Sequence, residues 1–191
     1  MLKTDQFRKK LKVELDGVPY MMVDVDFVRP GKGQGFVRTK LKNMISGAMI
    51  ERTFKSNESV KPAAVRDEEM QFLYENGGDY SFMDNRTYDQ ITMTADQLGT
   101  TVNYIYEGLT GTISFFNDIP IGCEIANFVE LEIIECEPGM KGNTATNAMK
   151  PAKVTSGYRV NVPLFVNQGE WIRIDTRTGD YSERCKRPEG R

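Results

Sequence analysis

A glycine-rich segment near the N-terminus presents one lysine amine with nothing beside it to bury the charge. The segment runs Pro30, Gly31, Lys32, Gly33, Gln34, Gly35, Phe36, and its alternating glycines leave little side-chain bulk and high backbone freedom. Five cations and no acid lie between positions 29 and 42, namely Arg29, Lys32, Arg38, Lys40 and Lys42. Such a group suits a phosphate backbone, although an exposed lysine on a flexible hairpin is usually only a solvated charge.

The spacing of these glycines excludes two familiar nucleotide-binding motifs. A Walker loop needs four residues between its first glycine and a Gly-Lys pair that is followed by Ser or Thr. A dinucleotide fingerprint needs Gly-x-Gly-x-x-Gly at the start of a helix. Here the residues after Gly35 predict a strand, so neither motif is present.

The remaining residue types offer little for catalysis or for metal binding. The chain has no histidine, and its three cysteines, Cys123, Cys136 and Cys185, are widely spaced. Without histidine, Ser-His-Asp and Cys-His schemes are excluded, and no pair of carboxylates has a spacing that stands out. A zinc site would need more ligands of the usual kind. We expect reduced cysteines, no catalytic residue, no metal and no cofactor.

The charge of the chain is distributed unevenly, although the formal net charge is only −2. Residues 1–64 hold 13 Lys and Arg against 7 Asp and Glu, residues 65–128 hold 2 against 11, and residues 129–191 hold 10 against 9. A basic N-terminal third suits RNA, and an acidic middle third does not. The asymmetry would equally keep the protein soluble, and charge alone does not decide between these explanations.

Composition and hydropathy predict a cytoplasmic globular protein. The chain is 39% hydrophobic and 27% charged, which is ordinary for a globular protein. It has no apolar run of 18 or more residues, and its N-terminus lacks the apolar core of a signal peptide. We expect a monomer that has no membrane partner.

The first block, residues 1–64, contains the strands that would hold the glycine-rich segment. Asp16-Gly17 suits a tight turn between two short apolar runs and predicts a hairpin. Residues 23–27 alternate and predict a half-buried strand. Further strands at 36–41 and 49–54, joined through a turn at Ser46-Gly47, suggest an SH3-like barrel. Residues 55–62 are polar and predict a loop and linker.

The second and third blocks, residues 65–128 and 129–191, are each about the size of a five-stranded OB barrel. Predicted strands are residues 70–74, 80–83, 112–116, 119–125, 129–133, 158–166 and 171–176. A short helix is predicted after Thr94, with Gln97 completing a capping box and Leu98, Val102 and Ile105 on its apolar face. A long loop is predicted from Glu137 to Pro151.

The motifs of the chain, taken in order, resemble those of the bacterial elongation factor P family. The segment 30–36 is similar to the lysine-bearing loop of that family. The other matching motifs are FKS at 54–56, FLYENG at 72–77, FMDN at 82–85 with TY at 87–88, FVELEI at 128–133, PG at 138–139 with KG at 141–142, VPLFV at 162–166 and DTRTGDY at 175–181. They cover nearly the whole chain and are highly specific together.

This resemblance implies a fold and a function. The fold is all-β, with an N-terminal SH3-like, KOW-type barrel followed by two OB barrels in an L-shaped arrangement that has the outline of tRNA. The function is that of a translation factor that contacts both ribosomal subunits between the P and E sites. It relieves stalling at consecutive prolines by positioning the CCA end of the peptidyl-tRNA, and it performs no catalysis.

The resemblance also implies roles for individual residues. Lys32 matches the modified lysine of the family, which in many relatives carries a β-lysyl group attached by an enzyme resembling lysyl-tRNA synthetase. The other implied positions are the tip residues Pro30, Gly31, Gly33, Gln34 and Gly35, the tRNA-backbone candidates Arg29, Arg38, Lys40 and Lys42, and the E-site loop candidates Gly142, Asn143 and Thr144. Two departures stand out. Asn143 replaces an expected acid, and Gly35 replaces the alanine of many relatives, which is expected to loosen the tip.

Two other functions stay open at this stage. A generic RNA-binding module of SH3 and OB barrels, acting outside the ribosome, would need exposed aromatic platforms. Phe72, Phe82 and Phe115 fall within predicted strands and are expected in the core. The other alternative is an enzyme, and the absence of histidine argues against it. Ribosome binding that depends on Lys32 would separate the translation factor from both alternatives.

Overall fold

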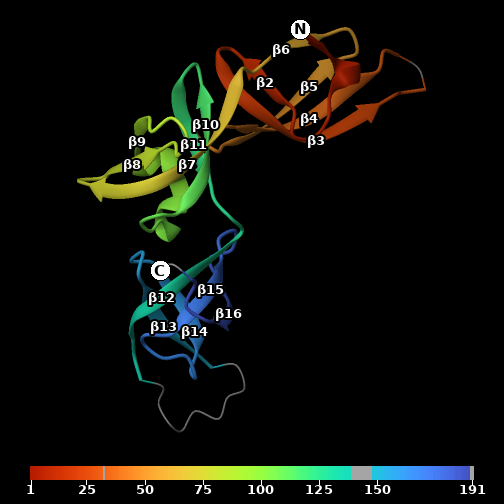
Figure 1. Cartoon of the computed structure of the whole chain (residues 1–191). Coiled ribbons are helices and arrows are strands. Elements are labelled where there is room, and N and C mark those ends of the chain that lie inside the picture. Colours follow the sequence, from red (N-terminus) through yellow and green to blue (C-terminus); the bar gives the residue numbers. More distant parts are fainter. Residues whose placement is uncertain (32, 139–147, 190–191) are drawn as a thin grey trace. The chain divides into compact units, whose positions relative to one another are not determined.

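Over its described residues the chain folds into three β-sheets with one short α-helix (Figure 1). The computed structural model describes residues 1–31, 33–138 and 148–189. Two compact units divide the chain, Met1–Glu68 with Ile113–Gly122 and Glu69–Thr112 with Cys123–Arg191. The all-β prediction is confirmed, whereas the domain boundaries after residues 64 and 128 stay predictions.

The first sheet has six strands in the order β1-β6-β2-β3-β4-β5. Its elements are β1 (Leu2–Lys3), the 3₁₀ helix η1 (Thr4–Gln6), β2 (Lys12–Leu15), β3 (Val18–Val28), β4 (Phe36–Asn43), β5 (Met49–Lys55) and β6 (Ser59–Pro62). The predicted turn joins β2 to β3, with φ 51° at Asp16 and 78° at Gly17. Both residue types tolerate positive φ, so the turn fixes the register of the hairpin.

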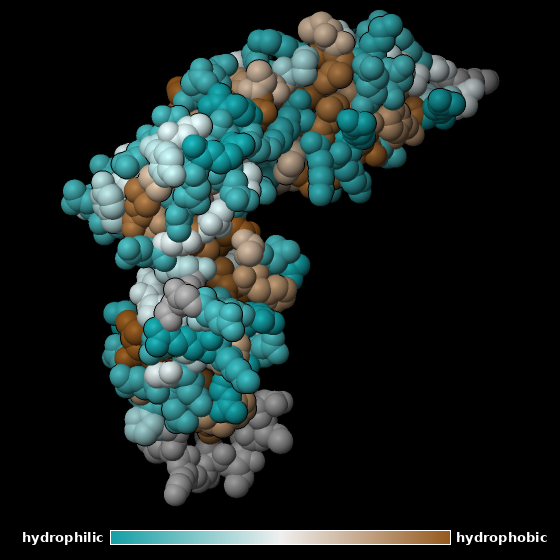
Figure 2. All heavy atoms as spheres, viewed as in Figure 1, coloured by the Kyte–Doolittle hydropathy of each residue, from teal (hydrophilic) through white to brown (hydrophobic). Residues whose placement is uncertain are grey.

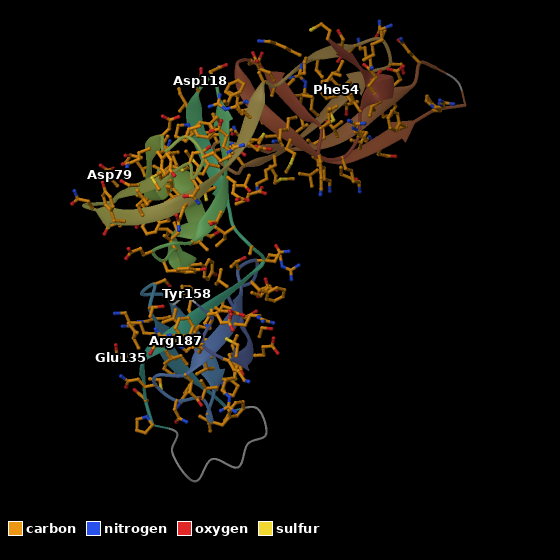
Figure 3. The ribbon with its side chains drawn as sticks, in the orientation of Figure 1. Phe54, Asp79, Asp118, Glu135, Tyr158 and Arg187 are labelled. Carbon is orange, nitrogen blue, oxygen red and sulfur yellow. The ribbon has the colours of Figure 1, made fainter. Side chains whose placement is uncertain are left out.

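A compact apolar cluster lies against this sheet. It comprises Phe7, Val13, Leu15, Met22, Val37, Leu41, Phe54 and Val60. Figure 3 shows Phe54 among the strands of the first sheet, where its ring meets that of Phe7 edge to face at a centroid distance of 5.2 Å. Burial of these side chains supplies the main driving force for folding here.

Strand β3 departs from the predicted half-buried stripe. Val23 and Phe27 are 39% and 52% exposed, and only Val25 of the three apolar residues packs against the cluster. For Val23 the cause is a register shift between Met22 and Asp24, which leaves Val23 opposite no residue of β4. A bulge of this kind adds one residue to a strand and breaks its alternation.

The prediction of a loop and linker at residues 55–62 is wrong in its second half. Residues Ser59–Pro62 form β6, which pairs with both β1 and β2. Only Val60 of this strand is buried, at 5% exposure. A strand of four residues with one inward side chain has no apolar period, so its sequence pattern is that of a loop.

The second sheet has the strand order β11-β10-β7-β8-β9. Its elements are β7 (Val65–Asn76), β8 (Asp79–Met83), β9 (Gln90–Thr94), α1 (Ala95–Leu98), the 3₁₀ helix η2 (Gly99–Tyr104), β10 (Thr110–Phe116) and β11 (Ile119–Glu124). The capping box of Thr94 and Gln97 is confirmed. The helix is one α-helical turn that continues as η2, and β9 before it was not predicted.

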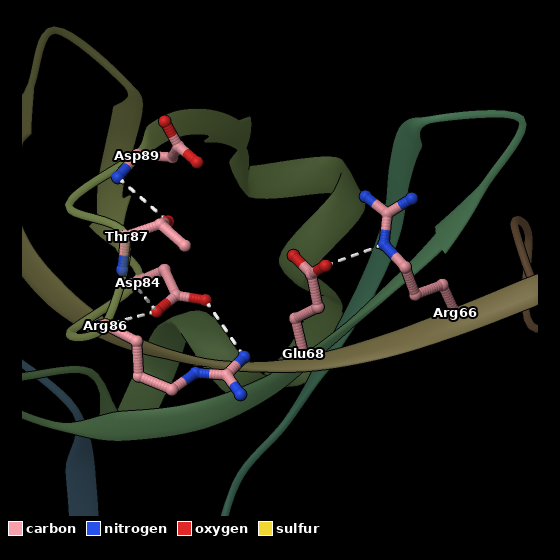
Figure 4. A network of polar contacts seen from close by, with 6 residues as sticks. All are labelled: Arg66, Glu68, Asp84, Arg86, Thr87 and Asp89. Atoms are coloured by element: carbon pink, nitrogen blue, oxygen red, sulfur yellow. Dashed lines mark hydrogen bonds and ion pairs between the residues drawn. The ribbon is translucent and has the colours of Figure 1, made fainter.

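The turn after β8 is built around one buried carboxylate (Figure 4). Asp84 is 4% exposed and accepts the backbone N–H groups of Arg86 at 2.6 Å and Thr87 at 3.2 Å. These backbone bonds, with the Arg86 guanidinium 3.3 Å away, lower the pKa of Asp84. The FMDN and TY motifs of the sequence therefore mark a structural turn.

The third sheet has the strand order β14-β13-β12-β15-β16. Its strands are β12 (Phe128–Cys136), β13 (Met149–Val154), β14 (Arg159–Pro163), β15 (Trp171–Asp175) and β16 (Tyr181–Cys185). In β12 the predicted alternation holds, since Val129, Leu131 and Ile133 are all buried. The predicted loop up to Pro151 is too long, because β13 begins at Met149, and neither β13 nor β16 was predicted.

Residues 1–31, 33–138 and 148–189 contain neither a membrane-spanning helix nor a cluster of metal ligands. No helix in these ranges is long and apolar enough to cross a membrane. No group of three or more Cys, Asp or Glu side chains in the same ranges could hold a metal ion.

Candidate nucleic-acid interface

The glycine-rich segment forms the connection between β3 and β4, and residues 29–35 are called the tip loop below. Lys32 lies outside the described residues. Arg29, Pro30, Gly31, Gly33 and Gln34 are all exposed. A Cβ added at Gly31 would meet nothing within 4 Å, and one at Gly33 would meet only the Pro30 ring at 3.8 Å. The described part of the loop is therefore open to a large partner such as a nucleic acid.

Gly35 at the end of the tip loop is better fixed than the sequence suggested. Its carbonyl accepts a hydrogen bond from the backbone N–H of Ser56 at 3.2 Å, and a second from the Ser56 hydroxyl. The expectation that glycine at position 35 loosens the loop did not include these two hydrogen bonds, which restrict Gly35.

Alternation along β4 places the predicted cations on one face of the strand. Arg38, Lys40 and Lys42 are exposed, while Val37, Thr39 and Leu41 between them are buried. Successive side chains of a strand point to opposite faces, so the three cations share the outer face. The structure thus brings together three of the four predicted tRNA-backbone candidates, and Arg29 lies beyond the N-terminal end of the same strand.

Acids on the neighbouring strands partly neutralise these cations. Asp26 and Asp24 of β3 pair with Arg38 and Lys40 across the ladder, and Glu51 of β5 pairs with Lys40 from the other side. The Lys40 Nζ lies 3.7 Å from the Glu51 carboxylate. Counting acids only between positions 29 and 42 missed this arrangement, because it arises from strand pairing.

Asp24 has a second cation close by. The Lys9 Nζ lies 2.9 Å from its carboxylate, and this hydrogen-bonded contact lowers the pKa of Asp24. Exposed ion pairs of this kind contribute little free energy. A phosphate could therefore displace the acids from the cations at small cost.

Strand β5 carries two cations that were not predicted as site residues, Lys55 on the same face as Arg38 and Lys40, and Arg52 on the opposite face. Lys55 pairs opposite Phe36 at the start of β4, and Arg52 pairs opposite Thr39. Arg38 lies 5.4 Å from the centroid of the Phe36 ring, and Arg52 lies 5.1 Å from that of Phe54. The antiparallel register of the predicted 36–41 and 49–54 strands, extended by one residue, would have placed Lys55 on the outer face beside Phe36.

The acidic stretch 65–128 differs in its ion pairing. Its two cations are Arg66 and Arg86, and the structure describes every residue of the stretch. Arg66 contacts Asp118 at 2.8 Å and Glu68 at 2.7 Å, and Arg86 contacts Asp84 at 3.3 Å. Both positive charges have carboxylate partners, and with only two cations against 11 acids the stretch 65–128 is unfavourable for a phosphate.

The predicted E-site loop candidates Gly142, Asn143 and Thr144 lie outside the described residues. They fall between β12 and β13. Lys150, the second residue of β13, is 5% exposed and donates from Nζ to the Glu137 carbonyl at 2.7 Å.

A groove of about 370 Å³ is lined by Tyr106, Phe128, Pro188 and other residues, and it includes the 2.9 Å ion pair of Arg173 with Glu130. It contains none of the predicted site residues.

The space-filling view shows how polar the exposed surface is (Figure 2). Hydrophilic residues cover most of the visible face, with scattered apolar side chains between them. The aromatic residues expected in the core, Phe72, Phe82 and Phe115, are buried at 6%, 1% and 4% exposure. They are therefore not available as stacking platforms for single-stranded RNA.

Three family models match the chain in sequence order. They are the elongation factor P KOW-like domain over residues 3–60, the elongation factor P OB domain over residues 65–123, and the elongation factor P C-terminal domain over residues 129–184. Together with the three sheets, they confirm the predicted fold class of a KOW-like domain followed by OB-type domains.

Curated relatives match over nearly the full chain. The chain is 50% identical over 184 residues to elongation factor P of Clostridium novyi, covering 96% of this chain and 100% of that relative. It is 48% identical over 184 residues to elongation factor P of Pelotomaculum thermopropionicum, with the same coverage. Among solved structures, a translation initiation factor eIF-5A family protein from Naegleria fowleri is similar in fold alone, with a TM-score of 0.50 and 13% identity over 64% of this chain and 93% of that one.

Proposed function

The chain belongs to the elongation factor P family of translation elongation factors, and from this premise we propose that it binds the ribosome between the P and E sites. There it stimulates peptide-bond formation at consecutive prolines, which are poor peptidyl donors and acceptors. The observation that carries the proposal is the tip loop, an exposed glycine-rich connection in the most basic third of a chain that matches the family over 96% of its length.

In this function Lys32 reaches toward the CCA end of the peptidyl-tRNA near the peptidyl-transferase centre. The open backbone at Gly31 and Gly33 leaves room for RNA on both sides of that residue. The amine contacts the tRNA and restricts it to a reactive geometry, so the gain is one of positioning and the factor makes no bond. A reaction held in a near-attack arrangement needs no general base from the factor, which suits a chain without histidine.

The outer face of β4 then lies against the acceptor arm of the tRNA. Arg29, Arg38, Lys40 and Lys42 supply contacts to phosphates, which set orientation without reading sequence. Asp24 and Asp26 lie opposite Lys40 and Arg38 in the ladder, and the exposed Lys40–Glu51 pair gives way when a phosphate contacts Lys40. The acidic residues 65–128 are turned away from most of the RNA.

We also propose that Lys32 carries a covalent extension in its native host, of the β-lysyl type and attached by a synthetase-like enzyme. Glycines flank Lys32 on both sides, so the loop gives it no neighbouring side chain for extra contacts. One ammonium is a strongly hydrated point charge. A longer group with further donors would increase both reach and grip at that one position.

Mass spectrometry tests the extension. The protein is purified from its native cells and digested, and the mass of the peptide that contains Lys32 is measured. An added mass on Lys32 supports the proposal. An unmodified peptide from cells that translate polyproline proteins normally rules the extension out, without bearing on ribosome binding.

A cross-linking experiment tests the placement of the loop. A photoreactive group is introduced at Gln34, which is exposed in the tip loop, and as a control at Ser46, which lies in the exposed β4–β5 turn at the other end of β4. The probe at position 34 is expected to cross-link to the CCA end of P-site tRNA, and the probe at position 46 is not. Equal labelling from both positions contradicts the proposed placement.

A further inference from the structure

A residue of the β5–β6 turn fastens the tip loop at its β4 end. The Gly35 carbonyl accepts from both the backbone N–H and the hydroxyl of Ser56. Ser56 directly follows β5, whose last residue Lys55 pairs with Phe36, the first residue of β4. The backbone bond therefore extends the β4–β5 ladder by one residue into the loop, and the hydroxyl bond reinforces it.

Ser56 is in turn held by the N-terminal segment. Thr4 of η1 is 3% exposed, and its hydroxyl donates to the Ser56 carbonyl at 2.8 Å. A buried hydroxyl that finds its partner in this way is costly to remove. A continuous chain of hydrogen bonds thus runs from Thr4 through Ser56 to Gly35 and connects the loop to the body of the first sheet.

The missing side chain of Gly35 makes the contact with Ser56 possible. A Cβ at position 35 would lie 3.0 Å from the Ser56 hydroxyl oxygen and 3.3 Å from the Val28 carbonyl oxygen. Both distances are shorter than ordinary van der Waals contacts, so a side chain here would push Ser56 away or widen the base of the loop. At Gly31, by contrast, an added Cβ meets open space. An alanine at position 35 would therefore need Ser56 or the Val28 backbone to shift by a few tenths of an ångström, whereas the glycine of this chain allows the close contact without a shift.

We infer that Ser56 is a positioning residue for the tip loop, an inference that rests on the proposed role of Lys32. By holding Gly35, three residues beyond Lys32, it restricts the directions in which the loop leaves the sheet. A loop that is ordered before binding loses less conformational entropy when it meets the tRNA. Ser56 acts on the loop by hydrogen bonding to its backbone, and the Thr4 hydroxyl in turn donates a hydrogen bond to the Ser56 carbonyl.

The order of the free loop tests the inference without any ribosome. Nuclear magnetic resonance relaxation gives the order parameters of the Gly33 and Gly35 amides in wild type, Ser56→Ala, Ser56→Thr and Ser46→Ala. We expect a fall toward the flexible range, below about 0.6, only in Ser56→Ala. Ser56→Thr keeps the hydroxyl, and Ser46→Ala removes a serine from the opposite end of the β4–β5 hairpin. Unchanged order parameters in Ser56→Ala overturn the inference.

A kinetic comparison connects this order to function. The maximal rate of Pro–Pro bond formation should fall about five-fold in Ser56→Ala, the effect of about one hydrogen bond, and recover in Ser56→Thr. Wild-type rates in Ser56→Ala overturn the inference. If Lys32→Ala also keeps the wild-type rate, the proposed function itself is wrong.

Discussion

Lys150 is a charged residue that is buried and has a structural role. It shares the inward face of β13 with Ala152 and Val154 and is only 5% exposed. Its methylene stem packs in the interior while Nζ donates to the Glu137 carbonyl at 2.7 Å. Long cationic side chains often bury the stem and keep the head satisfied in this way. The contact ties the start of β13 to the segment that follows β12.

Replacing Lys150 should therefore destabilise the protein more than replacing an ordinary surface lysine. Lys150→Ala removes buried methylene groups and one hydrogen bond, and we expect it to lower the unfolding free energy by about 1–3 kcal/mol. Urea unfolding measures the change. Lys153→Ala, in the same strand but less buried, is the matched control and should be near neutral. Equal losses in the two variants contradict the structural role of Lys150.

Asp175 allows a prediction about pH. Hydrogen bonds from the Arg177 side chain, at 2.6 and 3.0 Å, and from the Arg177 backbone lower the pKa of Asp175 to about 2. The unfolded-state value is near 3.9. Because the folded pKa is the lower one, the ionised group contributes stability above about pH 4, and this is lost as pH falls through about 2.

The stability difference between wild type and Asp175→Asn should therefore be constant above about pH 5 and shrink between pH 4 and pH 2. Urea unfolding at several pH values measures it. Asp16→Asn serves as control, since asparagine tolerates the positive φ of the β2–β3 turn. A difference that is as large at pH 2 as at pH 6 would show that the ionised carboxylate is not the cause.

At the scale of elements, the turns and the strongly alternating strands were predictable, and the short or irregular strands were not. Asp16-Gly17 and Asn117-Asp118 both adopt the positive φ angles that their residue types suggest. The missed strands carry too few inward apolar side chains for a period. Only Val60 is buried in β6, only Met93 in β9 and none in β16.

The candidate site was likewise predictable only in part. Alternation along β4 was enough to predict that Arg38, Lys40 and Lys42 share one face. Their partial neutralisation by Asp24, Asp26 and Glu51 depends on the β3–β4–β5 register. That register includes a bulge at Val23, and no local sequence signal marks it. The hold of Ser56 on Gly35 likewise joins residues 21 positions apart.

The β15–β16 turn offers a sharp test of packing in the third sheet. Gly179 has φ 82°, and an added Cβ would lie 2.5 Å from the Tyr158 hydroxyl oxygen and 3.2 Å from that of Tyr104. Gly157, in the β13–β14 turn, has a similar φ of 85° but open space around it. The two glycines therefore separate backbone strain from steric clash.

Alanine at Gly157 should cost about 1–2 kcal/mol from the left-handed backbone alone. Gly179→Ala should cost about 1–3 kcal/mol more, because the tyrosines must move. Thermal or urea unfolding gives both values. Tyr158→Phe in the Gly179→Ala background should recover part of the loss. If the two alanine variants are equally stable, the tyrosine contact does not constrain the turn.

At the scale of the whole molecule, the uneven charge predicts where RNA affinity resides. The N-terminal third is basic, and the ion pair of Lys40 in β4 with Glu51 is exposed and weak. The middle third has two cations, Arg66 and Arg86, and carboxylates contact both. Phosphate binding by the full chain should therefore depend on the first sheet and its tip loop.

The salt dependence of tRNA binding measures that dependence. Arg29→Gln should reduce the slope of log affinity against log salt by about 0.7–0.9 if Arg29 neutralises one phosphate. Lys61→Gln removes a cation of the same sheet that lies 2.9 Å from Glu14 and should leave the slope near the wild-type value. Equal changes in the two variants would show that net charge alone governs binding.

We propose that the tip loop acts at the peptidyl-transferase centre through Lys32. The most direct test is the single-turnover rate of Pro–Pro bond formation on purified ribosomes, with wild type, Lys32→Ala and Lys42→Ala, beside a non-proline pair as reference. We predict that wild type accelerates only the proline reaction, that Lys42→Ala keeps most of this acceleration, and that Lys32→Ala abolishes it while its unfolding free energy stays within about 0.5 kcal/mol of wild type. A folded Lys32→Ala protein that accelerates Pro–Pro synthesis as well as wild type would contradict this role of Lys32.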